Sequence, residues 1–335
     1  MGARQLPRPP LYTKAMKKLV CLDAATLYPA GDHEWNRFAD IAATVEIYDR
    51  TAPDQTAARC AGADAVLTNK VAIGADIMDA CPDLRYIGVL ATGYNIVDTA
   101  AARERGITVA NIPAYSTMSV AQTAIALLLA LTNRVEHYTR RIEDGAWVNS
   151  PDFSFTDFAW HELADKTMAI VGFGNIGRAV AAIAAAMGMK IMAVTSKPAE
   201  SLPEGYVKAD LDTAFATADI VSLHCPLTPD TAGMVNARRL ASMKRDAIII
   251  NTARGGLVDE AALADALHRG IIARAGLDVL SSEPPAHSNP MLSAPNTVLT
   301  PHIGWASFEA RRRLFEIALG NLRAFAEGKP ANTVI

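Results

Sequence analysis

The chain has 335 residues, of which 50% are hydrophobic and 20% are charged, with 32 lysine and arginine residues against 35 aspartate and glutamate residues. This length suggests about two domains, and this composition predicts a large folded core rather than a disordered chain. The formal net charge of -3 excludes the strongly basic surface that a nucleic acid or an anionic membrane attracts, so we expect neither partner.

The four cysteines form no C-x-x-C pair and no Cys/His cluster with the spacing of a zinc site, which favours a reduced, cytoplasmic protein without a metal. Residues 1–15 are basic and proline-rich but lack the apolar core of a signal peptide. The first strand pattern begins at Met16, so we place residues 1–15 outside the fold. The longest apolar runs are shorter than the roughly 18 residues that a membrane span requires.

Short apolar runs alternate with helical stretches along almost the whole chain, which is typical of parallel sheets built from strand–helix–strand units. The first series of predicted strands comprises residues 17–23, 44–49, 64–69, 86–92 and 107–112. The second series comprises residues 167–174, 190–196, 219–225, 247–253, 275–280 and 297–302. A helical segment at 119–147 separates the two series, and an amphipathic helix that ends at Gly328 follows the second.

A G-x-G-x-x-G motif, formed by Gly172, Gly174 and Gly177, stands where the first strand of the second series meets an alanine-rich helix. In this context the first glycine allows a tight turn, the second lets a pyrophosphate approach the backbone, and the third lets helix and strand pack closely. The helix that opens at Asn175 and Ile176 provides N–H donors and positive potential for the same anion. A glycine-rich turn without a ligand is the alternative, but the strand before the motif and the helix after it favour dinucleotide binding.

These patterns predict an α/β protein with two doubly wound parallel-sheet domains, one a Rossmann-type dinucleotide-binding domain and one a smaller, flavodoxin-like substrate domain. We expect the dinucleotide-binding domain at residues 116–302, including a dimerisation helix. The substrate domain is then discontinuous and comprises residues 16–115 and 303–335. Two chain crossings between the domains would form a hinge around a cleft.

The second strand of the dinucleotide-binding domain ends without the acidic residue that usually binds the adenosine ribose. Thr195, Ser196 and Lys197 stand there instead. A carboxylate would repel a 2′-phosphate, whereas hydroxyl and ammonium groups bind one, so the sequence favours NADP(H) and leaves NAD(H) open. A solvated surface lysine is the alternative interpretation of Lys197.

Three residues with anion-binding or acid–base chemistry, Arg254, Glu283 and His302, follow strands of the second series. Each alone has an ordinary explanation, namely a turn arginine, a solvated glutamate and a core histidine. Because ligands bind at the carboxyl ends of the strands in such sheets, the three residues can face one cleft. There they suit the reduction of a 2-keto acid, with the arginine on the carboxylate and the histidine as proton donor. The glutamate would orient the imidazole and favour its protonated form.

The chain resembles the D-isomer-specific 2-hydroxyacid dehydrogenase family from about residue 17 to about residue 330. The motifs that carry this resemblance are "VGFGNIG", "NTARGGLVDE", "GLDVLSSEPP" and "TPHIGWAS", in this order. Within the family the chain is most similar to glycerate dehydrogenases, also called hydroxypyruvate reductases, through "VLTNKV", "ATGYNIVD", "NIPAYST" and "HIGWAS". The resemblance implies Arg254, Glu283 and His302 as the catalytic set. Glu283 argues against formate dehydrogenases of this fold, which carry glutamine at the matching position.

The resemblance also implies how the cofactor and the substrate are held. Asp278 would hold the nicotinamide amide, and Arg254 and His302 would also contact the substrate. Further cofactor contacts are implied for Cys225, Pro226, Thr231, Thr252, Ala253 and Gly304. From the other domain, the backbone near Asn69, Val71, Thr92 and Gly93 would hold the substrate carboxylate. The resemblance further implies a homodimer built from the cofactor domain.

We therefore expect an NAD(P)H-dependent oxidoreductase that reduces hydroxypyruvate to D-glycerate and glyoxylate to glycolate, and that also oxidises D-2-hydroxyacids. Two alternatives remain open, a broader 2-ketoacid reductase and a nucleotide-sensing corepressor of the same fold. The corepressors keep the same three residues, but this chain shows no basic or disordered interaction tail, which weighs against that role.

Overall fold

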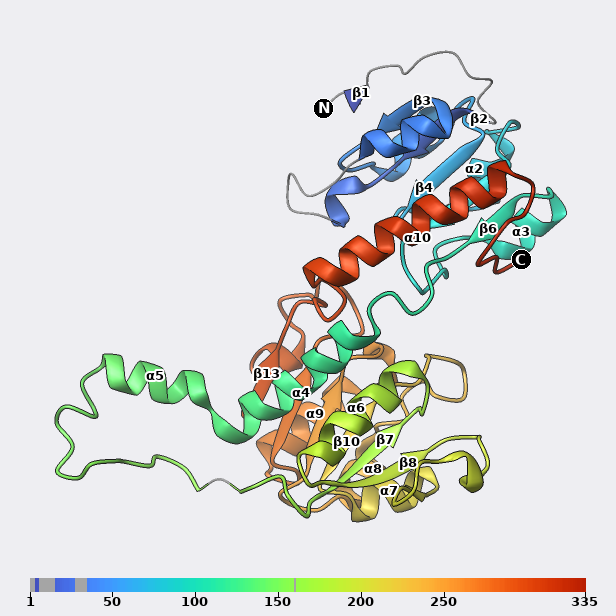
Figure 1. Cartoon of the computed structure of the whole chain (residues 1–335). Helices are drawn as coiled ribbons and strands as arrows, with labels where there is room; N and C mark the ends of the chain where they lie inside the picture. The colour runs from blue at the N-terminus through green and yellow to red at the C-terminus, as the bar shows by residue number, and fades with distance from the viewer. Residues whose placement is uncertain (1–3, 6–15, 28–34, 160) are drawn as a thin grey trace. The chain divides into compact units, whose positions relative to one another are not determined.

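The computed structural model describes residues 4–5, 16–27, 35–159 and 161–335, and the chain forms two compact units (Figure 1). The first unit comprises Met1–Ser116 and Ala306–Ile335, and the second comprises Thr117–Trp305. The chain therefore leaves the first unit once and returns to it through its last helix. These two crossings are predicted from the sequence at 115–116 and at 302–303.

The first unit is built on a six-stranded sheet in the order β1-β3-β2-β4-β5-β6, in which β2 to β6 are parallel. Its strands are β1 (Arg4–Gln5), β2 (Met16–Cys21), β3 (Ala42–Ile47), β4 (Ala65–Thr68), β5 (Tyr86–Val89) and β6 (Thr108–Ala110). β1 pairs antiparallel with β3, with Arg4 opposite Ile47. The expectation that residues 1–15 lie outside the fold is therefore wrong for Arg4 and Gln5, because the open edge of β3 offers backbone partners that no local pattern announces. The rest of that segment lies outside the described residues.

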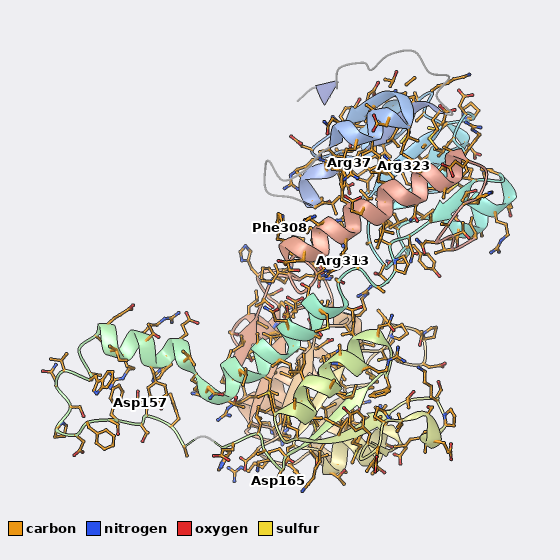
Figure 2. All side chains as sticks on the ribbon, viewed as in Figure 1. Arg37, Asp157, Asp165, Phe308, Arg313 and Arg323 are labelled. Atoms are coloured by element: carbon orange, nitrogen blue, oxygen red, sulfur yellow. The ribbon has the colours of Figure 1, made fainter. Side chains whose placement is uncertain are left out.

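Helices cover both faces of this sheet. They are α1 (Thr56–Cys60), α2 (Ala75–Asp79), α3 (Thr99–Glu104) and α10 (Phe308–Ala326), with 3-10 helices at Ala24–Thr26, Trp35–Asp40 and Pro53–Gln55. Ile87 packs in the apolar cluster with α1 to α3, whereas the ring of its neighbour Tyr86 lies 4.9 Å from that of Phe325 on α10. Successive strand residues point to opposite faces, so α10 covers the face opposite to α1, α2 and α3. Arg313 lies on α10 (Figure 2). Its Nε donates to the carbonyl O of Tyr115 at 2.8 Å.

The second unit is built on a seven-stranded, entirely parallel sheet in the order β13-β12-β11-β10-β7-β8-β9. Its strands are β7 (Thr167–Val171), β8 (Lys190–Val194), β9 (Val207–Lys208), β10 (Ile220–Leu223), β11 (Ile248–Asn251), β12 (Arg274–Leu277) and β13 (Thr297–Leu299). The sequence predicts all of these strands except β9. This edge strand is two exposed residues long, so it produces no buried run that a periodicity search could detect.

Two layers of helices sandwich the second sheet. The helices of this unit are α4 (Thr117–Asn133), α5 (Val135–Glu143), α6 (Asn175–Ala186), α7 (Leu211–Thr217), α8 (Ala237–Ser242) and α9 (Glu260–His268), with 3-10 helices at Ala199–Ser201, Gly255–Leu257 and Pro290–Leu292. Met168 and Ile170 of β7 pack with α4 and α6, whereas Ala169 and Val171 pack with α7, α8 and α9. The alternation of the strand side chains therefore supplies one core on each face.

The single helical segment expected at 119–147 is two helices that meet at a bend of 52°. Arg134 stands at the bend with a φ of +50°, which breaks the helical hydrogen bonds between α4 and α5. No residue of α5 is buried, and α5 extends away from the sheet of its unit (Figure 1). Asp157 ties the following stretch back to α5, because its Oδ2 lies 2.7 Å from Nε2 of His137 and 2.9 Å from Nε of Arg141 (Figure 2).

Within the described part of the chain, no single helix is long and apolar enough to cross a membrane. The bent pair α4 and α5 reaches the required length and composition when the two are counted together. The apolar side of α4, however, packs against the sheet of its own unit.

Candidate active site

The glycine motif joins β7 to α6. Gly172 has a φ of +96°, and a Cβ there would lie 2.6 Å from the backbone N of Cys225. A Cβ on Gly177 would lie 2.1 Å from the carbonyl O of Gly172. No side chain caps the start of α6 at Gly174, where a Cβ would meet nothing within 4 Å. Gly172 and Gly177 therefore fix the turn. Gly174 leaves room beside the free N–H donors at the start of α6, which suits a pyrophosphate.

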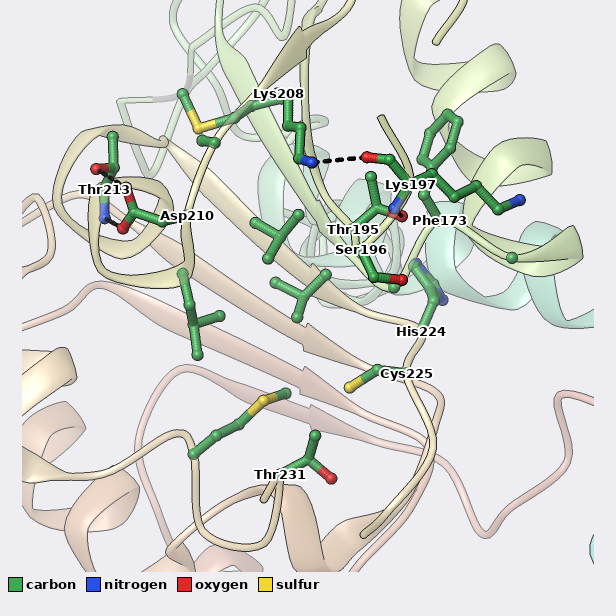
Figure 3. Close-up of a pocket in the computed structure, with 18 of the residues that line it drawn as sticks. Phe173, Thr195, Ser196, Lys197, Lys208, Asp210, Thr213, His224, Cys225 and Thr231 are labelled. Atoms are coloured by element: carbon green, nitrogen blue, oxygen red, sulfur yellow. Dashed lines mark hydrogen bonds between the residues drawn. The ribbon is translucent and has the colours of Figure 1, made fainter. Parts of the chain in front are cut away.

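A cavity of about 1010 Å³ lies at the carboxyl ends of β7, β8 and β10 (Figure 3). It is large enough for a substantial part of a dinucleotide, since small-molecule sites occupy roughly 300–1,000 Å³. Many of the predicted cofactor residues line it, namely Gly172, Gly174, Thr195, Ser196, Lys197, Cys225, Pro226 and Thr231. The others lie outside its lining, namely Asn175, Ile176, Gly177, Thr252, Ala253, Asp278 and Gly304.

The residues predicted to contact the adenosine ribose lie together in this cavity (Figure 3). The backbone N of Lys197 donates to Oγ1 of Thr195 at 3.2 Å, and Nζ of Lys208 donates to the carbonyl O of Lys197 at 2.7 Å. Lys208 was not predicted from the sequence, because it lies on β9, an edge strand of two exposed residues. Asp210 also lines the cavity, but its carboxylate caps α7 by accepting from N and Oγ1 of Thr213, and these bonds lower its pKa.

His224, which was not predicted as a site residue from the sequence, follows β10 and lines the same cavity. Its Nε2 lies 2.8 Å from Oγ of the buried Ser222, and its Nδ1 is buried without a hydrogen-bond partner among the described residues. Burial lowers the pKa of His224 to about 4, so the ring is neutral near pH 7. Oγ1 of Thr252, after β11, is likewise buried and unpaired within the described chain. Buried polar atoms normally have partners, so Nδ1 of His224, which lines the cavity, fits a site that a polar cofactor completes.

His302 and Glu283 form a direct pair. Nδ1 of His302 lies 2.6 Å from Oε2 of Glu283, and the two side chains are 31% and 36% exposed. Oε1 of Glu283 accepts from the backbone N of Leu280 at 3.1 Å, which holds the carboxylate in place. Because Nδ1 is engaged, Nε2 is the ring nitrogen available to a substrate.

Asp278 holds the turn that carries His302. Its carboxylate, on a residue only 2% exposed, accepts from Oγ1 of Thr300 at 2.6 Å and from the backbone N atoms of Ile303 and Gly304 at 2.9 and 2.8 Å. His302 has a φ of +53°, a left-handed conformation that costs energy for a residue with a side chain. Asp278 therefore stabilises a strained turn that aims the imidazole. The contacts of Asp278 and Gly304 with a cofactor stay predictions.

Arg254 lies on the loop after β11, beside the loop after β12 that carries Glu283. Its side chain is exposed, and Nη1 donates to the carbonyl O of Ala253 at 2.6 Å. A Cβ on Gly255 would lie 1.9 Å from the carbonyl C of Leu280, so the two loops are in contact through their backbones. The order β11-β12-β13 thus places the three predicted catalytic residues on neighbouring loops at one edge of the sheet.

The residues predicted to hold a substrate carboxylate lie in the first unit. The backbone N atoms of Asn69 and Val71 donate to the carboxylate of Asp23 at 2.9 and 3.2 Å. Asp23 is 2% exposed, and burial raises its pKa. Thr92 and Gly93 lie in the turn after β5. An internal carboxylate thus engages the N–H groups of Asn69 and Val71, and the role of all four residues toward a substrate stays a prediction.

Known proteins resemble the chain over most of its length. The profile of the NAD binding domain of D-isomer specific 2-hydroxyacid dehydrogenases matches residues 125–304. A hydroxypyruvate reductase from Blautia hydrogenotrophica is 44% identical over 321 residues, which cover 95% of this chain and 99% of that protein. A glycerate dehydrogenase from Methylorubrum extorquens is 42% identical over 284 residues, which cover 84% and 88%. The crystal structure of the TT0316 protein from Thermus thermophilus aligns with a TM-score of 0.84 at 36% identity, over 95% of this chain and 100% of that chain.

The fold and the dinucleotide cavity define a two-domain α/β oxidoreductase with a nicotinamide dinucleotide cofactor. The chain belongs to the D-isomer specific 2-hydroxyacid dehydrogenase family. The family and the fold class predicted from the sequence are confirmed.

Proposed function

We propose that this chain is a cytoplasmic reductase of small 2-keto acids, which converts hydroxypyruvate to D-glycerate and glyoxylate to glycolate with NAD(P)H and also catalyses the reverse oxidations. The observation that carries the proposal is the 2.6 Å contact between Nδ1 of His302 and Oε2 of Glu283, on the same sheet edge as Arg254 and the cofactor cavity. The names of the two relatives, a hydroxypyruvate reductase and a glycerate dehydrogenase, support this substrate class.

Each catalytic side chain has one task in this reaction. When bound, the nicotinamide cofactor supplies the hydride. The guanidinium of Arg254 pairs with the substrate carboxylate and polarises the keto group. His302, as imidazolium, donates a proton from Nε2 to the carbonyl oxygen. Glu283 stabilises the imidazolium through Nδ1 and fixes the orientation of the ring.

A panel of keto acids tests the substrate assignment. Hydroxypyruvate and glyoxylate should give kcat/KM values about tenfold or more above those of pyruvate and phenylpyruvate, a difference of about 1.4 kcal/mol in transition-state binding. A site built for a small substrate rejects the bulky phenylpyruvate, and a site that hydrogen-bonds the hydroxyl group of hydroxypyruvate disfavours pyruvate, which lacks it. A clear preference for phenylpyruvate would indicate the broader 2-ketoacid reductase. No turnover of any keto acid at micromolar enzyme would instead favour a nucleotide sensor.

We propose that NADPH is preferred over NADH, because Thr195, Ser196 and Lys197 line the cavity where an acid would exclude a 2′-phosphate. The double variant Ser196→Asp, Lys197→Ala should reverse the preference, measured as the ratio of the two kcat/KM values. Lys190→Ala is the matched control, since Lys190 is exposed at the opposite end of β8 and should leave the ratio unchanged. An unchanged ratio in the double variant would place the 2′ contact elsewhere in the cavity.

We also propose that the chain is a homodimer. The segment from α5 to Phe153 exposes large apolar side chains, with Val135 at 68%, Trp147 at 52%, Val148 at 88% and Phe153 at 91%. Scattered single apolar residues are normal on a surface, whereas a group of them indicates a covered interface. Light scattering at micromolar protein should give twice the mass of one chain, and Val148→Asp with Phe153→Asp should shift the mass toward that of the monomer. A monomer mass for the wild type would refute the dimer.

A further inference from the structure

The second unit has a second cavity, which lies at the amino ends of the strands of its sheet. The candidate active site lies at their carboxyl ends. This cavity has a volume of about 200 Å³. Its lining includes the residues that directly precede β12 and β13, two residues shortly before β11, and the residue that follows α4. Because the strands are parallel, their amino ends lie at one edge of the sheet and their carboxyl ends at the other. The loops that carry Arg254, Glu283 and His302 are at the carboxyl edge. The second cavity is therefore separate from the candidate active site.

Three arginines line this cavity, and we call Arg134, Arg245 and Arg274 the arginine cluster. Asp246 is the carboxylate that lines the cavity with them, so three positive charges face one negative charge. Arg274 is half-buried. Among the residues that the structure describes, none accepts a hydrogen bond from the side chain of Arg245 or Arg274 or forms an ion pair with it. A half-buried cation without a partner is costly, so this cavity favours an anion from outside the chain.

The charges in the arginine cluster oppose one another. The pKa of Arg274 is lowered, first by burial and then by the positive charge of Arg134, while Asp246 acts in the opposite direction. Two guanidinium groups held near each other in a partly desolvated cavity repel. An anion bound between them converts this repulsion into two attractive interactions.

Arg134 is held in place by unusual backbone geometry and by side-chain contacts. Arg134 and Asn296 both line the cavity. The backbone of each is in the left-handed conformation, with φ values of +50° and +56°. Asparagine adopts this conformation readily, whereas arginine does so at a cost in energy. Nη2 of Arg134 donates to Oδ1 of Asn296 at 3.3 Å, and its guanidinium lies 4.1 Å from the centre of the Phe158 ring. These contacts preorganise the Arg134 guanidinium, as a ligand-binding group requires.

We propose that the arginine cluster binds a phosphoryl group, either as inorganic phosphate or as the phosphate of a small metabolite. The planar fork of a guanidinium group matches phosphate oxygens in a bidentate manner. A cavity of about 200 Å³ admits an anion of this size but not a dinucleotide. Such binding stabilises the folded second unit at the amino ends of its strands, away from the candidate active site. The proposal therefore does not depend on the proposed function.

Thermal unfolding of the full chain tests the proposal, with the tighter-binding nicotinamide cofactor at saturation so that phosphate does not compete for the glycine turn. Phosphate replaces chloride at constant ionic strength, up to about 100 times its dissociation constant. The melting temperature of the wild type should rise with the logarithm of the phosphate concentration once this exceeds the dissociation constant, by about 5 °C at the highest concentration. Arg274→Met keeps a long apolar stem and removes the charge. It should melt at or above the wild-type temperature in chloride and should not respond to phosphate.

Arg103→Met is the matched control, because Arg103 is exposed on α3 and does not line the cavity. It should respond to phosphate as the wild type does. Equal responses of Arg274→Met and the wild type would place the phosphate elsewhere and overturn the proposal. A lower melting temperature of Arg274→Met in both salts, with no difference in response, would reduce Arg274 to a structural role and also overturn it.

Two further measurements identify the ligand. Glycerol 3-phosphate in place of phosphate separates the two sources. A larger rise in melting temperature at equal ligand concentration indicates a metabolite, and an equal rise indicates inorganic phosphate. Light scattering at each protein concentration measures the mass of the assembly, and so shows whether a second copy of the chain is present that could occupy the cavity. If the phosphate response disappears where the chain self-associates, a carboxylate of the second copy fills the cavity and the proposal fails.

Discussion

Glu283→Gln should move the pH profile of keto-acid reduction to lower pH. The substitution keeps the size of the side chain but removes the charge that lies 2.6 Å from Nδ1 of His302 and stabilises the imidazolium. Reduction requires that imidazolium as proton donor, so the variant should be weak at neutral pH and partly recover in acid. Oxidation of the hydroxy acid requires neutral His302 as base, so its active range should also extend to lower pH. Steady-state rates in both directions across a pH series measure the shift.

His302→Ala should lower kcat by roughly 10²- to 10⁴-fold in both directions at every pH, because the general acid and base is lost. Cofactor affinity, measured by fluorescence titration, should stay close to that of the wild type, since His302 is not among the residues that line the dinucleotide cavity. His287→Ala is the matched control, because His287 is exposed on the same loop as Glu283 and should change little. If Glu283→Gln leaves both pH profiles in place, the two residues are not coupled, even if each proves essential.

Gly255→Ala should damage both stability and catalysis, although Gly255 bears no functional group. The added Cβ would lie 1.9 Å from the carbonyl C of Leu280 and 2.1 Å from its carbonyl O, and backbone atoms cannot rotate away. The loop after β11 must then separate from the loop after β12, at a cost of about 3 kcal/mol in the free energy of unfolding. Because this movement displaces Arg254 relative to Glu283, kcat/KM should fall by about 100-fold, as expected for a misplacement of about 1 Å.

Gly320→Ala is the control for the same chemical change. Gly320 lies within α10, and a Cβ there would meet nothing within 4 Å. This variant should gain about 0.5–1 kcal/mol in the free energy of unfolding, because alanine is the better helix former, and should keep its activity. Denaturant unfolding and steady-state kinetics on both variants test the pair of expectations. A Gly255→Ala enzyme with normal stability and rate would show that the contact between the two loops does not position the catalytic residues.

The sequence by itself determined the fold class and most of the strands, and it predicted which residues form the candidate catalytic set. These features are local, because a buried parallel strand is a short apolar run and a phosphate-binding turn is a fixed spacing of glycines next to a strand and a helix. Gly172 and Gly177 illustrate this, since the close approaches that the structure shows at both positions are those that the motif requires. Arg254, Glu283 and His302 could be grouped because each directly follows a strand, and neighbouring parallel strands end at one edge.

Only the tertiary structure decided how these residues are held. His302 contacts Glu283, and Asp278 accepts hydrogen bonds from the turn that carries His302. These contacts join residues on different loops, and no periodic pattern in the sequence predicts them. β9 and its Lys208 escaped prediction because a two-residue edge strand forms only when β8 is already in place to pair with it. The arginine cluster brings together residues from the end of α4 and from the starts of β11 and β12. Such features depend on contacts between residues far apart in the chain, so the amino-acid order near each residue could not reveal them.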